Sequence, residues 1–222
     1  MRILDLAYIL ALGAGIGLGT AHWAVAGRPA IGRVEVGAWT AWPGSGSREV
    51  DPYMRAYLAR GVHLPLGSGE GLELIAERDD AGQPLDGRCR YKLSGATPTA
   101  RGWTIGITDG DGLPFRLPLA RTSFTDSEIV RPEDGSLSII AAATPEAGNW
   151  LPLPASGGFQ IRLRLYDTPI SSQTGETRVA NLPRIARTLT DILSFWWQLR
   201  VRGLPSAQAA VSAPEGRRPA LH

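Results

Sequence analysis

An uninterrupted apolar segment near the amino terminus, residues 6–26, constrains this chain more than any other feature. It is 21 residues long and contains no charged side chain. A helix of about 20 apolar residues crosses a hydrocarbon core about 30 Å thick. The segment therefore predicts a transmembrane helix, with residues 1–27 as an N-terminal anchor, and the remaining chain must fold beside a membrane.

The same segment also has features of a secretory signal peptide. Arg2 supplies a basic start, and the Ala-Val-Ala of residues 24–26 before Gly27 fits a small-residue cleavage site. The apolar run is longer than a signal peptide needs, however, and Trp23 near its end is typical of an interfacial anchor. We therefore expect a retained anchor, which a mature protein beginning at Gly27 would contradict.

Small residues recur along the predicted helix at every fourth position. Ridges of glycine and alanine let two helices approach closely in lipid, so the anchor is also a candidate surface for homo-oligomer formation. The alternative is that these residues reflect composition alone. The residues predicted to lie in the membrane are Leu6, Gly13, Gly15, Gly17, Gly19 and Trp23, together with Trp196 and Trp197 near the other end of the chain.

Charge and cysteine content exclude several classes of function. The net charge is +2, but six arginines after residue 183 leave the part between the anchor and residue 182 mildly acidic. A mildly acidic body is not a nucleic-acid platform, so we expect no nucleic-acid partner. The single cysteine, Cys89, can form no internal disulfide and no structural zinc cluster. We expect neither a metal nor another cofactor.

Most of the chain between residues 33 and 182 alternates apolar and polar residues with the period of a β-strand. In the clearest case, residues 159–165, the odd positions are apolar and Gln160, Arg162 and Arg164 are expected on the solvent side. Turns rich in Gly, Pro and Asp separate such segments, and this pattern predicts an antiparallel β-sandwich or jelly-roll-like domain over residues 33–182. The other predicted strands lie at residues 33–36, 72–78, 88–93, 103–107 and 136–143.

A short helix interrupts the predicted strands. Asp51 followed by Pro52 is typical of a helix start, because aspartate accepts hydrogen bonds from the first turn and proline lacks an N–H that would have no partner there. We predict that this helix runs from Tyr53 to Arg60. Residues 39–47 before it are rich in Trp, Pro, Gly and Ser, which predicts a loop.

Beyond residue 182, apolar residues recur at helical spacing, which predicts an amphipathic helix over residues 183–202. Its arginines and the Phe-Trp-Trp cluster at 195–197 suit an interfacial helix that contacts the membrane, and packing onto the sandwich is the alternative. Residues 203–222 are rich in Pro, Ala and Ser and are predicted to form a disordered tail.

Motifs for catalysis are scarce. His63 is the only histidine between the anchor and the terminal residue, so a metal site or a serine triad has one candidate base. No nucleophile elbow or complete phosphate-binding loop is found. Asp79, Asp80 and Asp86 could serve as acid and nucleophile on a glycan, although surface turn aspartates are the simpler interpretation.

Aromatic and polar residues around the predicted helix are the stronger candidates for binding. Aromatic rings beside arginine and asparagine suit a sugar ring or an acyl chain. The alternative is that the helix closes one end of the sandwich, with the tyrosines in the core. The candidate ligand-binding residues are Trp42, Asp51, Tyr53, Arg55, Tyr57, Arg60, Asp86, Asn149 and Trp150.

Several short motifs follow one another in an order that one bacterial family shares. They include Trp42-Pro43-Gly44, Asp51-Pro52-Tyr53, the Leu-Asp-Gly-Arg-Cys-Arg-Tyr of residues 85–91, Gly148-Asn149-Trp150-Leu151-Pro152, Arg162-Leu163-Arg164-Leu165-Tyr166 and Leu182-Pro183-Arg184-Ile185. On these residues the chain resembles the family catalogued as domain of unknown function twelve-fourteen, over about residues 37–187. The resemblance implies a β-sandwich, jelly-roll-like domain and, in short members, an N-terminal membrane segment. It brings no established catalytic residues.

These observations predict a single-pass protein of a bacterial inner membrane whose β domain lies in the periplasm and serves binding or scaffolding in the cell envelope. Sidedness rests on the resemblance, because arginines flank the anchor on both sides. An enzyme is the less favoured expectation, and the alternative function is a hydrolase or lyase acting on envelope glycan. The expected partner is membrane lipid, through the N-terminal helix and, if it is interfacial, the C-terminal helix.

Overall fold

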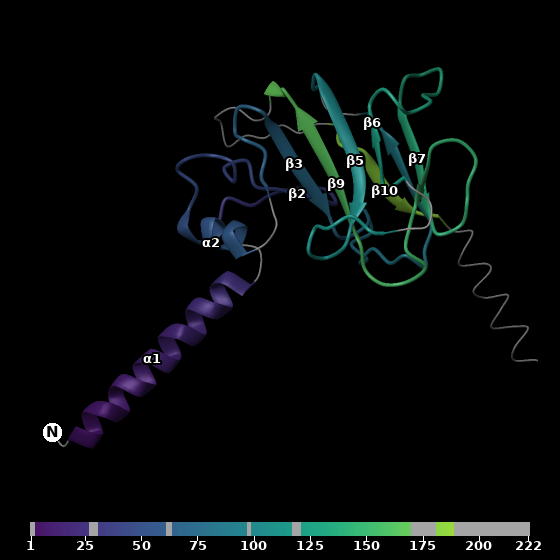
Figure 1. Ribbon diagram of the computed structural model, residues 1–222. Helices are drawn as coiled ribbons and strands as arrows, with labels where there is room; N and C mark the ends of the chain where they lie inside the picture. Colours follow the sequence, from purple (N-terminus) through teal and green to yellow (C-terminus); the bar gives the residue numbers. More distant parts are fainter. Residues whose placement is uncertain are drawn as a thin grey trace, which may run out of the picture. The chain divides into compact units, whose positions relative to one another are not determined.

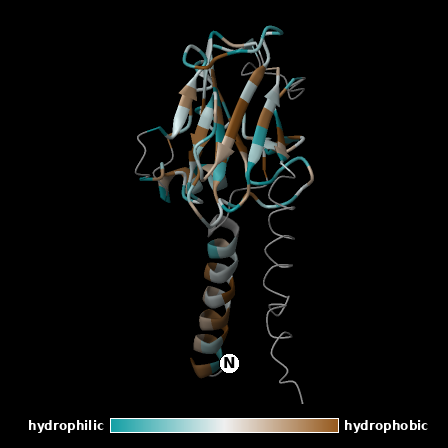
Figure 2. Cartoon of the chain, turned by 90° about the vertical axis from the view of Figure 1, so that its right-hand side faces the viewer, coloured by the Kyte–Doolittle hydropathy of each residue, from teal (hydrophilic) through white to brown (hydrophobic). Residues whose placement is uncertain are grey.

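The computed structural model describes residues 3–26, 31–60, 64–96, 99–116, 121–169 and 181–188 (Figure 1). Its N-terminal helix, α1 (Ile3–Ala26), is predominantly apolar, as Figure 2 shows. Over Ile3–Trp23 the helix is long and apolar enough to cross a membrane, and none of this span is buried in the rest of the chain. The predicted N-terminal apolar helix is therefore confirmed.

The rest of the described chain is mainly β, as predicted, and forms two sheets (Figure 1). The first sheet is antiparallel, with the strand order β1 (Val34–Val36), β2 (Trp39–Ala41), β3 (Gly71–Ala76), β9 (Gln160–Tyr166), β5 (Gly102–Thr108) and β6 (Ser123–Thr125). The second has the order β10 (Arg184–Arg187), β4 (Tyr91–Gly95), β7 (Leu137–Ala142) and β8 (Trp150–Pro152). Strands β7 and β8 run parallel, so the second sheet is mixed where an antiparallel one was predicted.

One cluster of buried apolar side chains contains residues of both sheets. Ile161, Leu163 and Leu165 of β9 belong to it and are fully buried, as are Tyr91 and Leu93 of β4. The apolar face predicted for β9 is therefore confirmed. Burying an aliphatic side chain of this size stabilises a fold by roughly 1.5–3 kcal/mol.

The other face of β9 differs from the prediction. Gln160 and Arg162 are predicted to face solvent, but they are only 4% and 8% exposed. The physical reason is that Arg162 lies beneath other elements: with Ile75, its partner in the β3–β9 register, it shares a pocket with side chains of the helix α2 (Pro52–Arg60). Alternation in a sequence identifies the polar face of a strand but not whether another element covers it.

Two strand boundaries also change. Residues 39–41, predicted to be loop, form β2, which joins β1 to β3 in the first sheet. Residues 88–90, predicted to begin a strand, belong to a turn in which the Cys89 N–H donates to the Asp86 carbonyl oxygen, and the strand starts at Tyr91.

The predicted amphipathic helix over residues 183–202 does not begin as a helix, because residues 184–187 form β10. Two side chains hold the chain extended there. Trp39 Nε1 donates to the Pro183 carbonyl oxygen at 2.7 Å, and the Asp80 carboxylate accepts the Ile185 N–H at 3.0 Å. Residues 189–222 lie outside the described residues, and with them Trp196, Trp197 and the predicted tail, as does His63.

Candidate functional site

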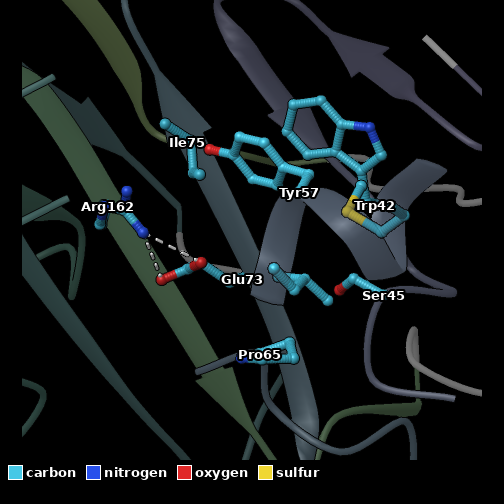
Figure 3. A pocket seen from close by; sticks show the side chains of 9 residues that line it. Trp42, Ser45, Tyr57, Pro65, Glu73, Ile75 and Arg162 are labelled. Atoms are coloured by element: carbon cyan, nitrogen blue, oxygen red, sulfur yellow. Dashed lines mark hydrogen bonds and ion pairs between the residues drawn. The ribbon is translucent and has the colours of Figure 1, made fainter. Parts of the chain in front are cut away.

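A pocket lies between α2 and the face of the first sheet that points away from the core (Figure 3). Strands β3 and β9 supply its floor, α2 supplies one wall, and the segments before and after α2 complete it. The lining residues are Trp42, Ser45, Met54, Tyr57, Leu58, Pro65, Glu73, Ile75 and Arg162.

The helical wall forms where the sequence predicts it. The Asp51 carboxylate accepts the N–H groups of Tyr53 and Met54, both at 3.0 Å, which caps the first turn of α2. The Arg55 guanidinium donates to the carbonyl oxygens of Arg48 and Val50 at 3.3 and 3.4 Å, tying the helix to the incoming loop. These hydrogen bonds fix the helix that carries Met54 into the pocket.

The loop before α2 is held against the segment after it by a close backbone approach. A side chain at Gly46 would overlap the carbonyl oxygen of Leu66, so this position requires glycine. The Ser68 N–H donates to the Gly46 carbonyl oxygen at 3.4 Å in the same contact. This approach holds together the two segments that carry the lining residues Ser45 and Pro65.

An ion pair lies on the floor of the pocket, as Figure 3 shows. Arg162 Nη1 lies 3.2 Å from each carboxylate oxygen of Glu73, and the Glu73 side chain is 19% exposed. Glu73 Oε1 also accepts from Arg164 Nε at 2.8 Å, so the carboxylate joins two arginines of β9. The charge of Glu73 is therefore balanced within the sheet.

Neutral side chains complete the hydrogen bonding of Arg162. Its Nε donates to Thr108 Oγ1 at 3.0 Å and its Nη2 to Gln160 Oε1 at 3.2 Å. Gln160 in turn donates to Glu77 at 3.0 Å. The network spans strands β3, β9 and β5 and holds the guanidinium in one position.

The structure places the sequence-predicted candidates on α2 and beside it in different roles. Trp42 and Tyr57 line the pocket together. Asp51 caps the helix, and Arg55 binds backbone carbonyl groups. Tyr53 and Arg60 are exposed on α2 and do not line the pocket.

The remaining candidates, Asp86, Asn149 and Trp150, are not brought to the pocket. Asp86 forms a two-pronged ion pair with Arg88, at 3.0 and 2.7 Å, and this hydrogen bonding lowers the pKa of Asp86. Asn149 binds both backbone groups of Val130, at 2.8 and 2.7 Å. Trp150 Nε1 donates to the Ala142 carbonyl oxygen at 2.9 Å, so these side chains hold turns and strands of the fold.

Sequence reasoning missed Glu73 and Arg162 as pocket residues. A signal for them exists, because glutamates on one strand and arginines on another can form cross-strand ion pairs. The pairing of β3 with β9 places Glu73 opposite Arg164, 91 residues further along the chain, and is not visible in the sequence.

A second polar cluster ties β10 to the turn after β3. Asp79, predicted on the surface, is 3% exposed and accepts the N–H groups of Ala81 and Gln83 at 3.1 and 2.8 Å. Arg187 Nε lies 3.3 Å from the Asp79 carboxylate, and Arg187 Nη2 donates to the Tyr91 hydroxyl at 3.3 Å. Burial raises the pKa of Tyr91. Hydrogen bonds and an ion pair within the chain therefore account for the burial of these polar side chains.

Among the described residues, no group of three or more His, Cys, Asp or Glu side chains is placed to hold a metal ion. Fold and pocket together define a class of protein: a mainly β domain of two sheets, with a pocket under a short helix, preceded by an apolar helix that could span a membrane.

Comparison with known proteins agrees with the motifs over part of the chain. Residues 70–170 match the model of the family described as Protein of unknown function (DUF1214), which confirms the resemblance seen in the motifs. The matched region contains the pocket floor, Glu73, Ile75 and Arg162, but not the wall formed by α2. No curated protein matches the chain.

The solved structures that are similar to this chain include two from bacteria. The crystal structure of the VPA0106 protein from Vibrio parahaemolyticus matches with a TM-score of 0.51 and 24% identity, over 63% of this chain and 36% of that one. An uncharacterised protein from Burkholderia cenocepacia matches with a TM-score of 0.36 and 21% identity, over 66% of this chain and 46% of that one. The chain thus spans less than half of either protein, and the first similarity supports the fold alone.

Proposed function

We propose that this protein is a membrane-anchored binding module of the bacterial cell envelope. In this proposal α1 crosses the inner membrane once, and the two sheets pack as a β-sandwich in the periplasm. The observation that carries the proposal is the pocket under α2, where Trp42 and Tyr57 stand over a floor that contains the paired charges of Glu73 and Arg162. Concave sites with apolar and aromatic walls and few polar groups are the usual form of a ligand site.

The alternative function, a hydrolase or lyase acting on envelope glycan, gains no support from this pocket. Glycoside hydrolysis ordinarily uses two carboxyl groups that flank the scissile bond. Glu73 is the one carboxylate among the described lining residues, and two arginines bind it. Such a site fits binding better than acid–base catalysis.

Thermal-shift measurement tests binding at the pocket. Purified full-length protein in detergent is heated with envelope glycans, phospholipids or divalent ions, and the unfolding temperature is recorded. We expect at least one ligand to raise it for the wild type and for Tyr53→Ala, an exposed position on α2, but not for Tyr57→Ala, which removes a pocket wall. A shift that persists in Tyr57→Ala, or no shift with any ligand, would contradict the proposal.

A reporter fused to the C-terminus tests the location of the domain. A periplasm-dependent reporter such as alkaline phosphatase should be active, because one membrane crossing after a cytoplasmic amino terminus places the rest of the chain outside. Activity of a cytoplasm-dependent reporter instead would place the domain on the other side.

A further inference from the structure

The chain enters the β domain next to the pocket. Strand β1 starts at Val34, eight residues after α1 ends at Ala26, and its register pairs Val34 with Ala41. The next residue, Trp42, lines the pocket. Eight residues span at most about 29 Å when fully extended, which limits the distance from Ala26 to Val34. Crossing from Val34 to its partner Ala41 and moving on to Trp42 adds about 10 Å, so the Trp42 backbone lies within about 40 Å of the end of α1.

If α1 is in the membrane, this eight-residue connection keeps the pocket within about 40 Å of the end of the membrane helix. A short connection converts binding into a local event with a high effective concentration, so weak intrinsic affinity is sufficient for occupancy. The inference below therefore rests on the proposed function, in which α1 is a retained anchor.

The interior of the pocket suits an uncharged chain better than a charged group. Six of the nine lining residues are apolar or aromatic. Glu73 and Arg162 are paired with each other, so an ionic group inside would have to displace one of them. A sugar ring would need several hydrogen-bonding partners. Apart from the Glu73–Arg162 ion pair, the lining residues offer few polar groups, the Ser45 hydroxyl among them.

The surface near the pocket carries exposed apolar side chains. Leu64, next to the lining residue Pro65, is 85% exposed, and Tyr53 on α2 is 45% exposed. Tyrosine with its apolar ring and polar hydroxyl is typical of membrane interfaces. Arg60 is exposed in the last turn of the same helix and adds a positive charge to the surface of α2.

From these features we propose that the pocket under α2, with a volume of about 40 Å³, holds a short stretch of one acyl chain of a membrane phospholipid, with the phosphate headgroup outside the pocket. The protein would thus bind lipid at two places, along α1 and in the β domain. The second site is the one that distinguishes a lipid-binding domain from a domain that is merely tethered.

Photocrosslinking of the full chain tests this proposal. The protein is reconstituted in vesicles of phosphatidylethanolamine and phosphatidylglycerol that contain a small fraction of phosphatidylethanolamine with a diazirine in its acyl chain. After illumination, mass spectrometry maps the adducts on peptides. We expect adducts on α1 and on the peptide that contains Met54 and Tyr57.

Two variants separate pocket binding from chance contact. Ser45→Trp fills the pocket and should lower the labelling of the α2 peptide about fivefold or more. Ser156→Trp, at an exposed position between β8 and β9 that does not line the pocket, should leave this labelling unchanged. Labelling of α1 is the internal standard in both. If Ser45→Trp does not reduce the labelling of the α2 peptide, the proposal is overturned.

A competition on the wild type makes the result independent of whether Ser45→Trp folds. Free oleate in excess should reduce labelling of the α2 peptide, and a water-soluble N-acetylglucosamine disaccharide should not. Displacement by the disaccharide would assign the pocket to a sugar and overturn the lipid assignment. Labelling of α1 without α2 would refute this inference alone, whereas absence of labelling on α1 would refute the membrane anchor of the proposed function.

Discussion

The ion pair between Glu73 and Arg162 should be strongly coupled, and a double-mutant cycle measures the coupling free energy. The cycle compares Glu73→Leu, Arg162→Met and the double variant by urea unfolding of the full chain in detergent, followed by near-ultraviolet circular dichroism. Each single change removes one partner from a site where Arg162 is 8% exposed and the Glu73 side chain is 19% exposed.

The expected magnitudes follow from what each change leaves behind. Removing one partner of a fully buried pair costs about 3–5 kcal/mol, because the other charge stays buried without compensation. Here the cost should be lower, at about 2–3 kcal/mol for each single variant, since Arg164 still binds Glu73 and Thr108 still binds Arg162. The double variant leaves no unpaired charge from the pair and should cost about 2 kcal/mol. The two single costs together exceed this by about 2–4 kcal/mol, which is the expected coupling.

A matched cycle on Arg33 and Glu35 serves as the control. These side chains form a 3.0 Å ion pair but are 46% and 57% exposed, so their coupling should be below about 0.5 kcal/mol. Additive effects at Glu73 and Arg162, or a coupling no larger than that of the control, would refute the reasoning that the pocket floor is a closed, buried ion pair.

Three further predictions concern the residues that hold the fold around the pocket. Asp51→Ala should destabilise the domain by about 1 kcal/mol because it removes the cap of α2, and Asp51→Ser should restore most of this loss in the same urea titration. Asn149→Ala should cost about 2 kcal/mol, since the amide makes two hydrogen bonds to Val130 and a third to the Ser138 carbonyl oxygen at 2.8 Å; a loss within the error of the measurement would show that water replaces them. Hydrogen bonding from Arg90 lowers the pKa of Glu146, so this pair stabilises the folded chain above the carboxyl's ordinary pKa of 4.5 and loses that contribution as the pH falls through the lower folded-state value. Glu146→Gln should therefore be less stable than the wild type at pH 7, with a difference that disappears in acid, and a difference independent of pH would count against the ion pair.

Features with a strong local signal could be predicted from the sequence. The apolar helix, the capped start of α2 and the apolar faces of β3, β5 and β9 follow from local composition and alternation. The strands that were missed, such as β2 and β10, are three or four residues long and have a proline or glycine within two residues of an end. Their extended form depends on partners distant in the chain, as in the hydrogen bond from Trp39 to Pro183.

The candidate site could be predicted only in part. The sequence identified Trp42 and Tyr57, which lie close together along the chain, but grouped them with Asn149 and Trp150, which belong to the other sheet region. It placed Arg162 in solvent, because the alternation of β9 carries no information about the helix that covers its polar face. What the sequence lacks is the long-range pairing of β3 with β9.

Protease accessibility in spheroplasts tests the central claim most directly, that the β domain is held to the inner membrane by α1. Inner membranes washed with carbonate should retain the full-length protein, and proteinase added to intact spheroplasts should digest the β domain while sparing a fragment that contains α1. Release of the protein by carbonate, a mature chain that begins at Gly27, or complete protection of the domain in intact spheroplasts would contradict the account.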